Sequence, residues 1–91
     1  MQRVESGTPI NRTDTGVVSI APGTLLGFYV NNKNVGATLV IADGTAASNT
    51  AITGTITPLI GFHRVGAYCR NGCYITIAVD AMDITFFFAA G

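Results

Sequence analysis

The stretch that decides the fold runs from Tyr68 to Phe88 and reads YCRNGCYITIAVDAMDITFFF. It predicts three consecutive strands: one that ends near Cys69, one from Cys73 to Val79, and one that carries Ile84 to Phe88. Asn71-Gly72 is typical of the tight turn of a β-hairpin. We therefore expect a packed β core whose last three strands follow one another closely.

The core is predicted from side chains that alternate along the strands, since successive residues of a strand point to opposite faces. Cys73 and Val79 are expected on the same side as Ile75 and Ile77. The expected core residues are Leu26, Phe28, Val30, Leu39, Ile41, Ile75, Ile77, Ile84 and Phe86.

Further short strands are expected upstream, separated by turn residues such as Pro22-Gly23 and Asp43-Gly44. Their ranges are 16–21, 24–31, 37–42, 50–57 and 62–68. Gly27 lies inside one of them and indicates a bulge or a close backbone approach. Helical periodicity is not sustained anywhere. The sequence therefore predicts one all-β domain, residues 15–91, built as a small antiparallel β-sandwich of jelly-roll-like type.

Residues 1–14 are polar and unpatterned and contain four of the charged residues, Arg3, Glu5, Arg12 and Asp14. Two interpretations remain open for this segment. It is either a frayed terminus or an extended N-terminal arm that becomes ordered on a neighbouring molecule.

Composition limits the classes of partner. Of the 91 residues, 48% are hydrophobic and 11% charged, and the net charge is zero. We expect much of the surface to be covered by other protein, the alternative being a neutral surface rich in Thr and Asn. Nucleic-acid binding needs a basic excess, and a membrane span needs a long apolar run, so neither partner is expected. Without a signal-peptide pattern, we expect synthesis and use without secretion.

Residues able to do chemistry are few and scattered. His63 is the sole histidine and has no nucleophile motif around it, so a structural role is expected. Asp43, Asp80 and Asp83 fall at turns without the spacing of a calcium loop. Cys69 and Cys73 lack a second ligand pair for zinc. We expect two free thiols, the alternative being a disulfide. The sequence predicts no enzyme, cofactor or metal site.

Phe86-Phe87-Phe88 cannot all face one side of a strand. If Phe86 and Phe88 are in the core, Phe87 points outward, either under a loop or the N-terminal arm, or into a subunit contact. Tyr29 and Tyr74 are expected on similarly outward faces, and Tyr is enriched in interfaces. We predict an oligomer interface at Phe87, Tyr29 and Tyr74.

The order of motifs completes the sequence evidence: PGTLLGFYVNN, GATLVIADGTAA, ITGTITP, NGCYITI and DITFFF. From Gly16 to Phe88 the chain resembles the capsid decoration, or cement, proteins of tailed bacteriophages. The resemblance implies a small β-sandwich on the capsid exterior, made in the host cytoplasm. It further implies a trimer that bridges neighbouring major capsid proteins, with Arg3, Glu5, Arg12 and Asp14 in a capsid-contacting arm. The cysteine pair departs from the apolar residues usual there.

Two other functions stay open. A head- or tail-fibre module that recognises host glycan could use Tyr29 or Tyr68 together with the 31–34 loop. A small enzyme would need a catalytic constellation, and the sequence presents none.

Overall fold

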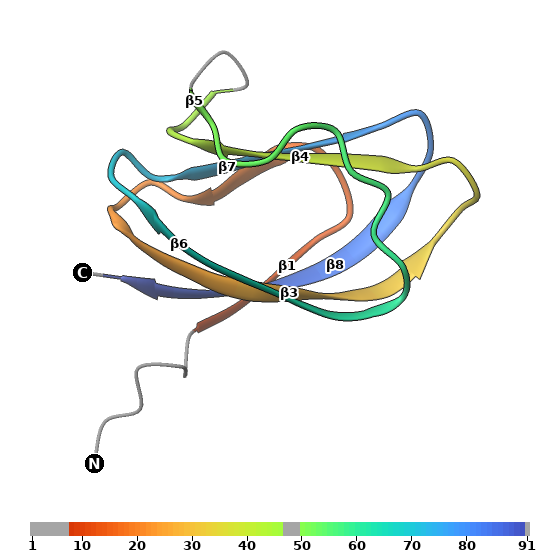
Figure 1. The fold of residues 1–91 in the computed structure, drawn as a ribbon, viewed down its shortest axis with the longest axis horizontal. Helices are drawn as coiled ribbons and strands as arrows, with labels where there is room; N and C mark the ends of the chain where they lie inside the picture. Colours follow the sequence, from red (N-terminus) through yellow and green to blue (C-terminus); the bar gives the residue numbers. More distant parts are fainter. Residues whose placement is uncertain (1–7, 47–49, 91) are drawn as a thin grey trace.

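A computed structural model describes residues 8–46 and 50–90 and shows two antiparallel sheets packed face to face (Figure 1). The strands are β1 (Thr8–Arg12), β2 (Gly16–Ser19), β3 (Gly23–Lys33), β4 (Thr38–Asp43), β5 (Thr50–Ala51), β6 (Gly61–Cys69), β7 (Cys73–Ala78) and β8 (Met82–Ala90). The first sheet has the order β1-β8-β3-β6 and the second has the order β2-β7-β4-β5. The predicted all-β sandwich is confirmed.

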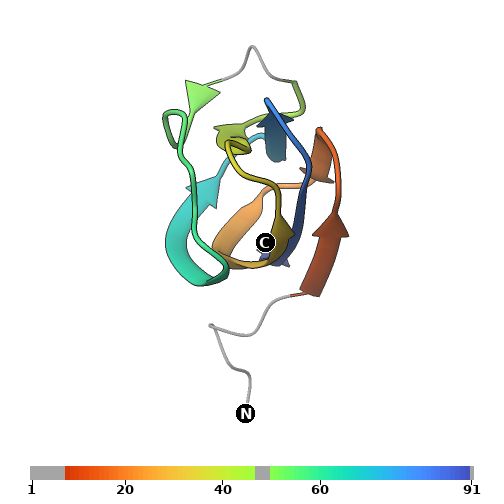
Figure 2. The same cartoon turned by 90° about the vertical axis from the view of Figure 1, so that its right-hand side faces the viewer.

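The strand pairing follows a simple rule. β1 pairs with β8, β2 with β7, β3 with β6, and β4 with β5, all antiparallel. Such pairing describes one long antiparallel ribbon, with β4 and β5 at its tip, that is rolled up so that β8 also pairs with β3 and β7 with β4. An eight-stranded double sheet of this kind is a jelly roll. β1 and β6 lie on opposite sides of the molecule (Figure 2).

Rolling explains why the predicted hairpin at Asn71-Gly72 is wrong. β6 belongs to the first sheet and β7 to the second, so the chain crosses between sheets at this corner. Gly72 has a φ of +109°, and a Cβ there would lie 2.6 Å from the carbonyl oxygen of Ser19. The carbonyl of Gly72 accepts a hydrogen bond from Gly44 at 3.0 Å. The Asn-Gly pair therefore docks onto the β4–β5 turn instead of closing a hairpin.

Most of the predicted core is buried between the sheets. These fully buried residues are Phe28, Val30, Leu39, Ile41, Ile75, Ile84 and Phe86, and Ile77 packs against them partly buried. The prediction for Leu26 is wrong, because Leu25 is buried and Leu26 only partly so. The β3 register shifts between Leu25 and Gly27, which inverts the alternation at that point.

Val79 is a second residue that does not point inward as predicted. It follows the end of β7 with a φ of +72° and is 80% exposed. The N–H of Asp80 donates to the carbonyl of Ala78 at 2.8 Å, which makes Val79 the centre of a γ-turn. The strand alternation therefore ends one residue earlier than the sequence pattern indicates.

The polar N-terminal segment contributes a strand. Thr8–Arg12 forms β1 and pairs with β8 from Thr8 opposite Phe88 to Arg12 opposite Ile84. Ile10 packs against the core. Residues 8–12 thus belong to the sandwich, and the expectation of an arm is left with residues 1–7, which lie outside the described residues and include Arg3 and Glu5.

The strand expected over residues 50–57 is shorter than predicted. β5 ends at Ala51, because the carbonyl of Ile41 accepts from both Ile52 and Thr53 and the chain turns away. Ile56 returns to form an isolated bridge with Leu39. The segment after β5 therefore borders β4 through a few isolated hydrogen bonds and not as a continuous strand.

Candidate interaction surface

Three aromatic side chains gather on the outer face of the first sheet. Tyr29 of β3 stands opposite Phe62 of β6, and Phe87 of β8 stands opposite Gly27 of β3. The rings of Phe62 and Phe87 lie 6.1 Å apart between centroids. Tyr29 is 44% exposed and Phe62 55% exposed, while Phe87 is partly buried. We call these three residues the aromatic face.

Gly27 makes this arrangement sterically feasible. A Cβ at this position would lie 2.7 Å from the Cζ of Phe62 and 2.5 Å from the carbonyl oxygen of His63. Without a side chain at Gly27, the ring of Phe62 can cross over β3 toward Phe87. The predicted bulge and close approach at Gly27 are both confirmed.

A polar network borders the aromatic face. Asn11 Nδ2 donates to Asp83 Oδ1 at 2.7 Å and to Thr85 Oγ1 at 3.2 Å. Asn31 Nδ2 donates to Thr85 Oγ1 at 2.9 Å and lies 3.4 Å from Asp83 Oδ1. Thr85 is the cross-strand neighbour of Tyr29. We call Asn11, Asn31, Asp83 and Thr85 the polar network; it joins β1, β3 and β8 beside an exposed ring.

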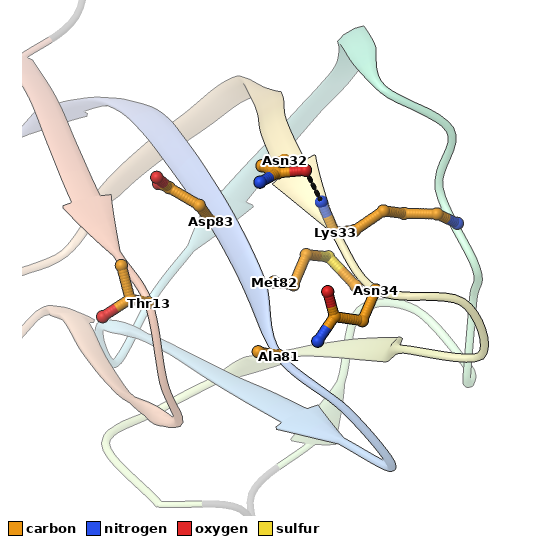
Figure 3. Close-up of a pocket in the computed structure, with 7 residues that line it drawn as sticks. All are labelled: Thr13, Asn32, Lys33, Asn34, Ala81, Met82 and Asp83. Carbon is orange, nitrogen blue, oxygen red and sulfur yellow. Dashed lines mark hydrogen bonds between the residues drawn. The ribbon is translucent and has the colours of Figure 1, made fainter.

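An open pocket of about 200 Å³ lies where β3 ends and β8 begins (Figure 3). Asn32 Oδ1 accepts from the N–H of Lys33 at 2.9 Å, and Asn34 Nδ2 donates to Asp80 Oδ1 at 2.9 Å. The hydrogen bonds from Asn34 and from the N–H of Ala81 lower the pKa of Asp80. The residues that line the pocket are Thr13, Asn32, Lys33, Asn34, Ala81, Met82 and Asp83. Asp83 thus connects the pocket with the polar network.

The predicted site residues divide between separate regions. Tyr29 and Phe87 lie together on the aromatic face. Tyr74 lies on β7 of the second sheet, beside Val17 and Ala42, and points away from the core like Thr76. The structure therefore brings together two of the three predicted interface residues.

Of the four residues predicted for the capsid-contacting arm, the structure describes Arg12 and Asp14, and these two form an ion pair. Arg12 Nη2 lies 3.1 Å from Asp14 Oδ1 and donates to the carbonyl of Thr15 at 3.1 Å. Arg12 is the last residue of β1 and Asp14 lies in the segment that joins β1 to β2, so their position is set by the sandwich.

Phe62 is the residue that sequence reasoning missed. Its signal was the alternation of FHRVGAY, which places Phe62 and Arg64 on one side and His63 and Val65 on the other. The polar network was also missed, because its members come from strands far apart in the sequence. Its only sequence signal was the amide-rich loop that begins at Asn31.

His63 and Asp43 both have structural contacts. His63 stacks on Phe28 with centroids 5.1 Å apart, and its Nε2 lies 2.6 Å from the carbonyl oxygen of Leu59. Asp43 Oδ1 accepts from the N–H of Asn71 at 2.8 Å. Within residues 8–46 and 50–90, no group of three or more His, Cys, Asp or Glu side chains is placed to hold a metal ion.

Cys69 and Cys73 are both free, as predicted, and both are fully buried. A hydrogen bond between the two side chains lowers the pKa of Cys69 and raises that of Cys73, and burial raises the pKa of Cys73 further. One thiolate held by the other thiol is the state favoured on first ionisation.

Comparison of the chain with protein-family models, curated protein sequences and solved structures found no match. The described part of the chain contains no helix long and apolar enough to cross a membrane. The surfaces described above, the fold and the sequence motifs are therefore the basis for a functional proposal.

Proposed function

We propose that this chain is a structural virion protein that decorates a tailed-phage capsid and stabilises it by bridging neighbouring major capsid proteins. The observation that carries the proposal is the aromatic face, where the exposed rings of Tyr29 and Phe62 lie beside the partly buried Phe87 on a charge-poor domain. Exposed apolar clusters of this kind mark protein contacts. Tyr and Phe are also enriched in the buried centres of interfaces.

The fold and the motifs support the same proposal by analogy. The motifs between Gly16 and Phe88 resemble phage decoration proteins, and jelly rolls are common in viral capsid domains. Fold analogy alone does not define a function. In this proposal the partners are the major capsid protein and further copies of the chain, arranged as a trimer on the capsid exterior. No catalytic step, cofactor, nucleic acid or membrane is assigned.

Capsid binding tests the proposal directly. Phage capsids that lack a decoration protein would be mixed with the wild-type chain, and occupancy would be measured by co-sedimentation and electron microscopy. We expect Phe62→Asp to reduce affinity at least tenfold, about 1.4 kcal/mol, because an unpaired charge would be buried in the subunit contact of the trimer that bridges the capsid proteins. Val35→Asp is the matched control, since Val35 is apolar, 95% exposed and placed in the β3–β4 turn.

Two outcomes would count against the proposal. Failure of the wild-type chain to bind capsids would contradict the decoration role itself. Equal occupancy by the wild type and Phe62→Asp would instead show that the subunit contact of the capsid-bound trimer lies away from the aromatic face.

A second candidate function is glycan recognition by a head- or tail-fibre module. The observation that favours it is the position of Tyr29 between Phe62 and Thr85, so that an exposed ring lies beside hydroxyl and amide groups. A sugar can stack its C–H face on a ring while its hydroxyls bond to neighbouring polar groups. Binding of the isolated protein to a glycan array, lost in Tyr29→Ala, would favour this function over decoration.

A further inference from the structure

The two cysteines lie on opposite sides of the corner that connects the sheets. Cys69 is the last residue of β6 and stands opposite Gly23 in the first sheet. Cys73 is the first residue of β7 and stands opposite Asp43 in the second sheet. Both side chains are fully buried in the same core cluster, and the hydrogen bond between the two thiols shifts their pKa values in opposite directions. A bond between them would therefore join the two sheets.

Backbone contacts hold this corner in place. Asn71 donates to Asp43, Gly44 donates to Gly72, and the Cα of Gly72 is packed close to the carbonyl oxygen of Ser19. Because the end of β2 and the β4–β5 turn both contact the corner, the two Cα atoms that carry the thiols are fixed relative to each other. The reduced protein thus already holds both thiols buried at the same corner.

We propose that Cys69 and Cys73 form an intramolecular disulfide that fastens the two sheets together when the protein meets a low-molecular-weight disulfide such as oxidised glutathione. The proposal is independent of the function assigned above. It concerns a modification that the free thiols of the structure have not undergone.

The reaction is a pair of thiol–disulfide exchanges. One cysteine thiolate attacks a sulfur of oxidised glutathione, a mixed disulfide forms, and one glutathione thiolate leaves. The second cysteine thiolate then attacks the protein sulfur of the mixed disulfide, which forms the Cys69–Cys73 bond and releases the second glutathione. Two electrons pass from the cysteines to glutathione, and the two thiol protons end on the released glutathione thiols.

Burial limits access of glutathione to either sulfur, so exchange in the folded protein depends on opening of the corner. The test therefore starts from the unfolded chain. Full-length protein in urea would be mixed with reduced and oxidised glutathione over a range of ratios, and half of each sample would be diluted to refold. Both halves would then be alkylated in concentrated urea, so that thiols buried in the folded protein also react, and the fraction of disulfide would be measured by mass spectrometry.

Arg70 provides a direct readout, because trypsin cleaves after it and separates the two cysteines. With the disulfide formed, the peptide that ends at Arg70 and the peptide that begins at Asn71 stay linked until a reductant is added. We expect the folded protein to hold the disulfide at a glutathione ratio at least tenfold more reducing than the unfolded chain requires. We also expect the oxidised protein to melt about 5 °C or more above the reduced protein.

Two results would overturn the proposal. One is a folded protein that keeps both thiols alkylatable at ratios where the unfolded chain is oxidised. The other is an oxidised protein that melts below the reduced one, since the bond would then oppose the native corner. Cys73→Ala is the matched control and should give only the mixed disulfide with glutathione at Cys69.

Discussion

Phe86 is the residue on which the packing between the sheets depends most. It is fully buried on β8, and its ring lies 5.8 Å from that of Phe28 between centroids. We expect Phe86→Ala to lower the free energy of unfolding by about 3–5 kcal/mol, because a large cavity would remain in a core of few residues. Urea unfolding followed by circular dichroism would measure the change.

The neighbouring Phe87 is the matched control for that substitution. It points to the outer face and is only partly buried against Phe62, so Phe87→Ala should cost clearly less than Phe86→Ala. Equal losses in the two variants would show that Phe87 contributes as much to the packing as Phe86 does.

At the scale of single residues, alternation predicted most of the core but failed at Leu25 and Leu26. The sequence indicated a bulge at Gly27, yet it could not indicate on which side of Gly27 the register would shift. That choice depends on β6 and β8, which pair with β3 from far along the chain. Phe62 was missed for the same reason, because its contact with Phe87 crosses β3.

Among the elements, β1 is the one whose contribution to stability can be predicted most clearly. It covers one side of β8, packs Ile10 against the core and contributes Asn11 to the polar network. We expect the chain lacking residues 1–13 to melt roughly 5–15 °C below the chain lacking residues 1–7, since about 1–2 kcal/mol of burial and hydrogen bonding is lost. Thermal unfolding of the two truncated proteins would isolate the contribution of this strand.

The same truncation should also change solubility. Without β1, the N–H and C=O groups along one side of β8 lose their partner, and unpaired strands promote association between chains. Identical melting and identical solubility of the two truncated proteins would show that β1 is dispensable for the fold.

β1 and the corner at Asn71-Gly72 show what the sequence could not predict about elements. Residues 8–12 present one inward apolar side chain, Ile10, so the period-two pattern of a strand is absent. The Asn-Gly pair is typical of a β-hairpin turn, but this local preference does not decide which strands pair. The partner of β1 is β8, and the partner of the Asn-Gly corner is the β4–β5 turn. Both partners are distant in sequence and come close only when the ribbon is rolled up.

At the scale of the whole molecule, we expect the chain to self-associate into a trimer through the aromatic face. Sedimentation of the wild type should give three times the 9.4 kDa mass of the chain at micromolar concentration. Phe62→Asp should shift the protein toward monomer while circular dichroism stays unchanged. Phe62 suits this test better than Phe87, because its ring is 55% exposed and a charge there disturbs less packing.

Val35→Asp should leave the trimer intact, because Val35 lies in a turn away from the aromatic face. A monomeric wild type would contradict self-association in solution and confine assembly to the capsid. A trimer that persists in Phe62→Asp would place the subunit contact elsewhere, with Tyr74 on the second sheet as the next candidate.

The rolled ribbon also sets the order in which the chain can become structured during synthesis. β4 and β5 are close in sequence, so their pairing closes a short loop and costs little chain entropy. β1 leaves the ribosome before any other strand described here, yet its partner β8 is the last to be made. Thr8–Arg12 must therefore stay unpaired until β8 has been made, and its Pro9 and scarcity of apolar side chains make it a poor partner for other nascent chains meanwhile.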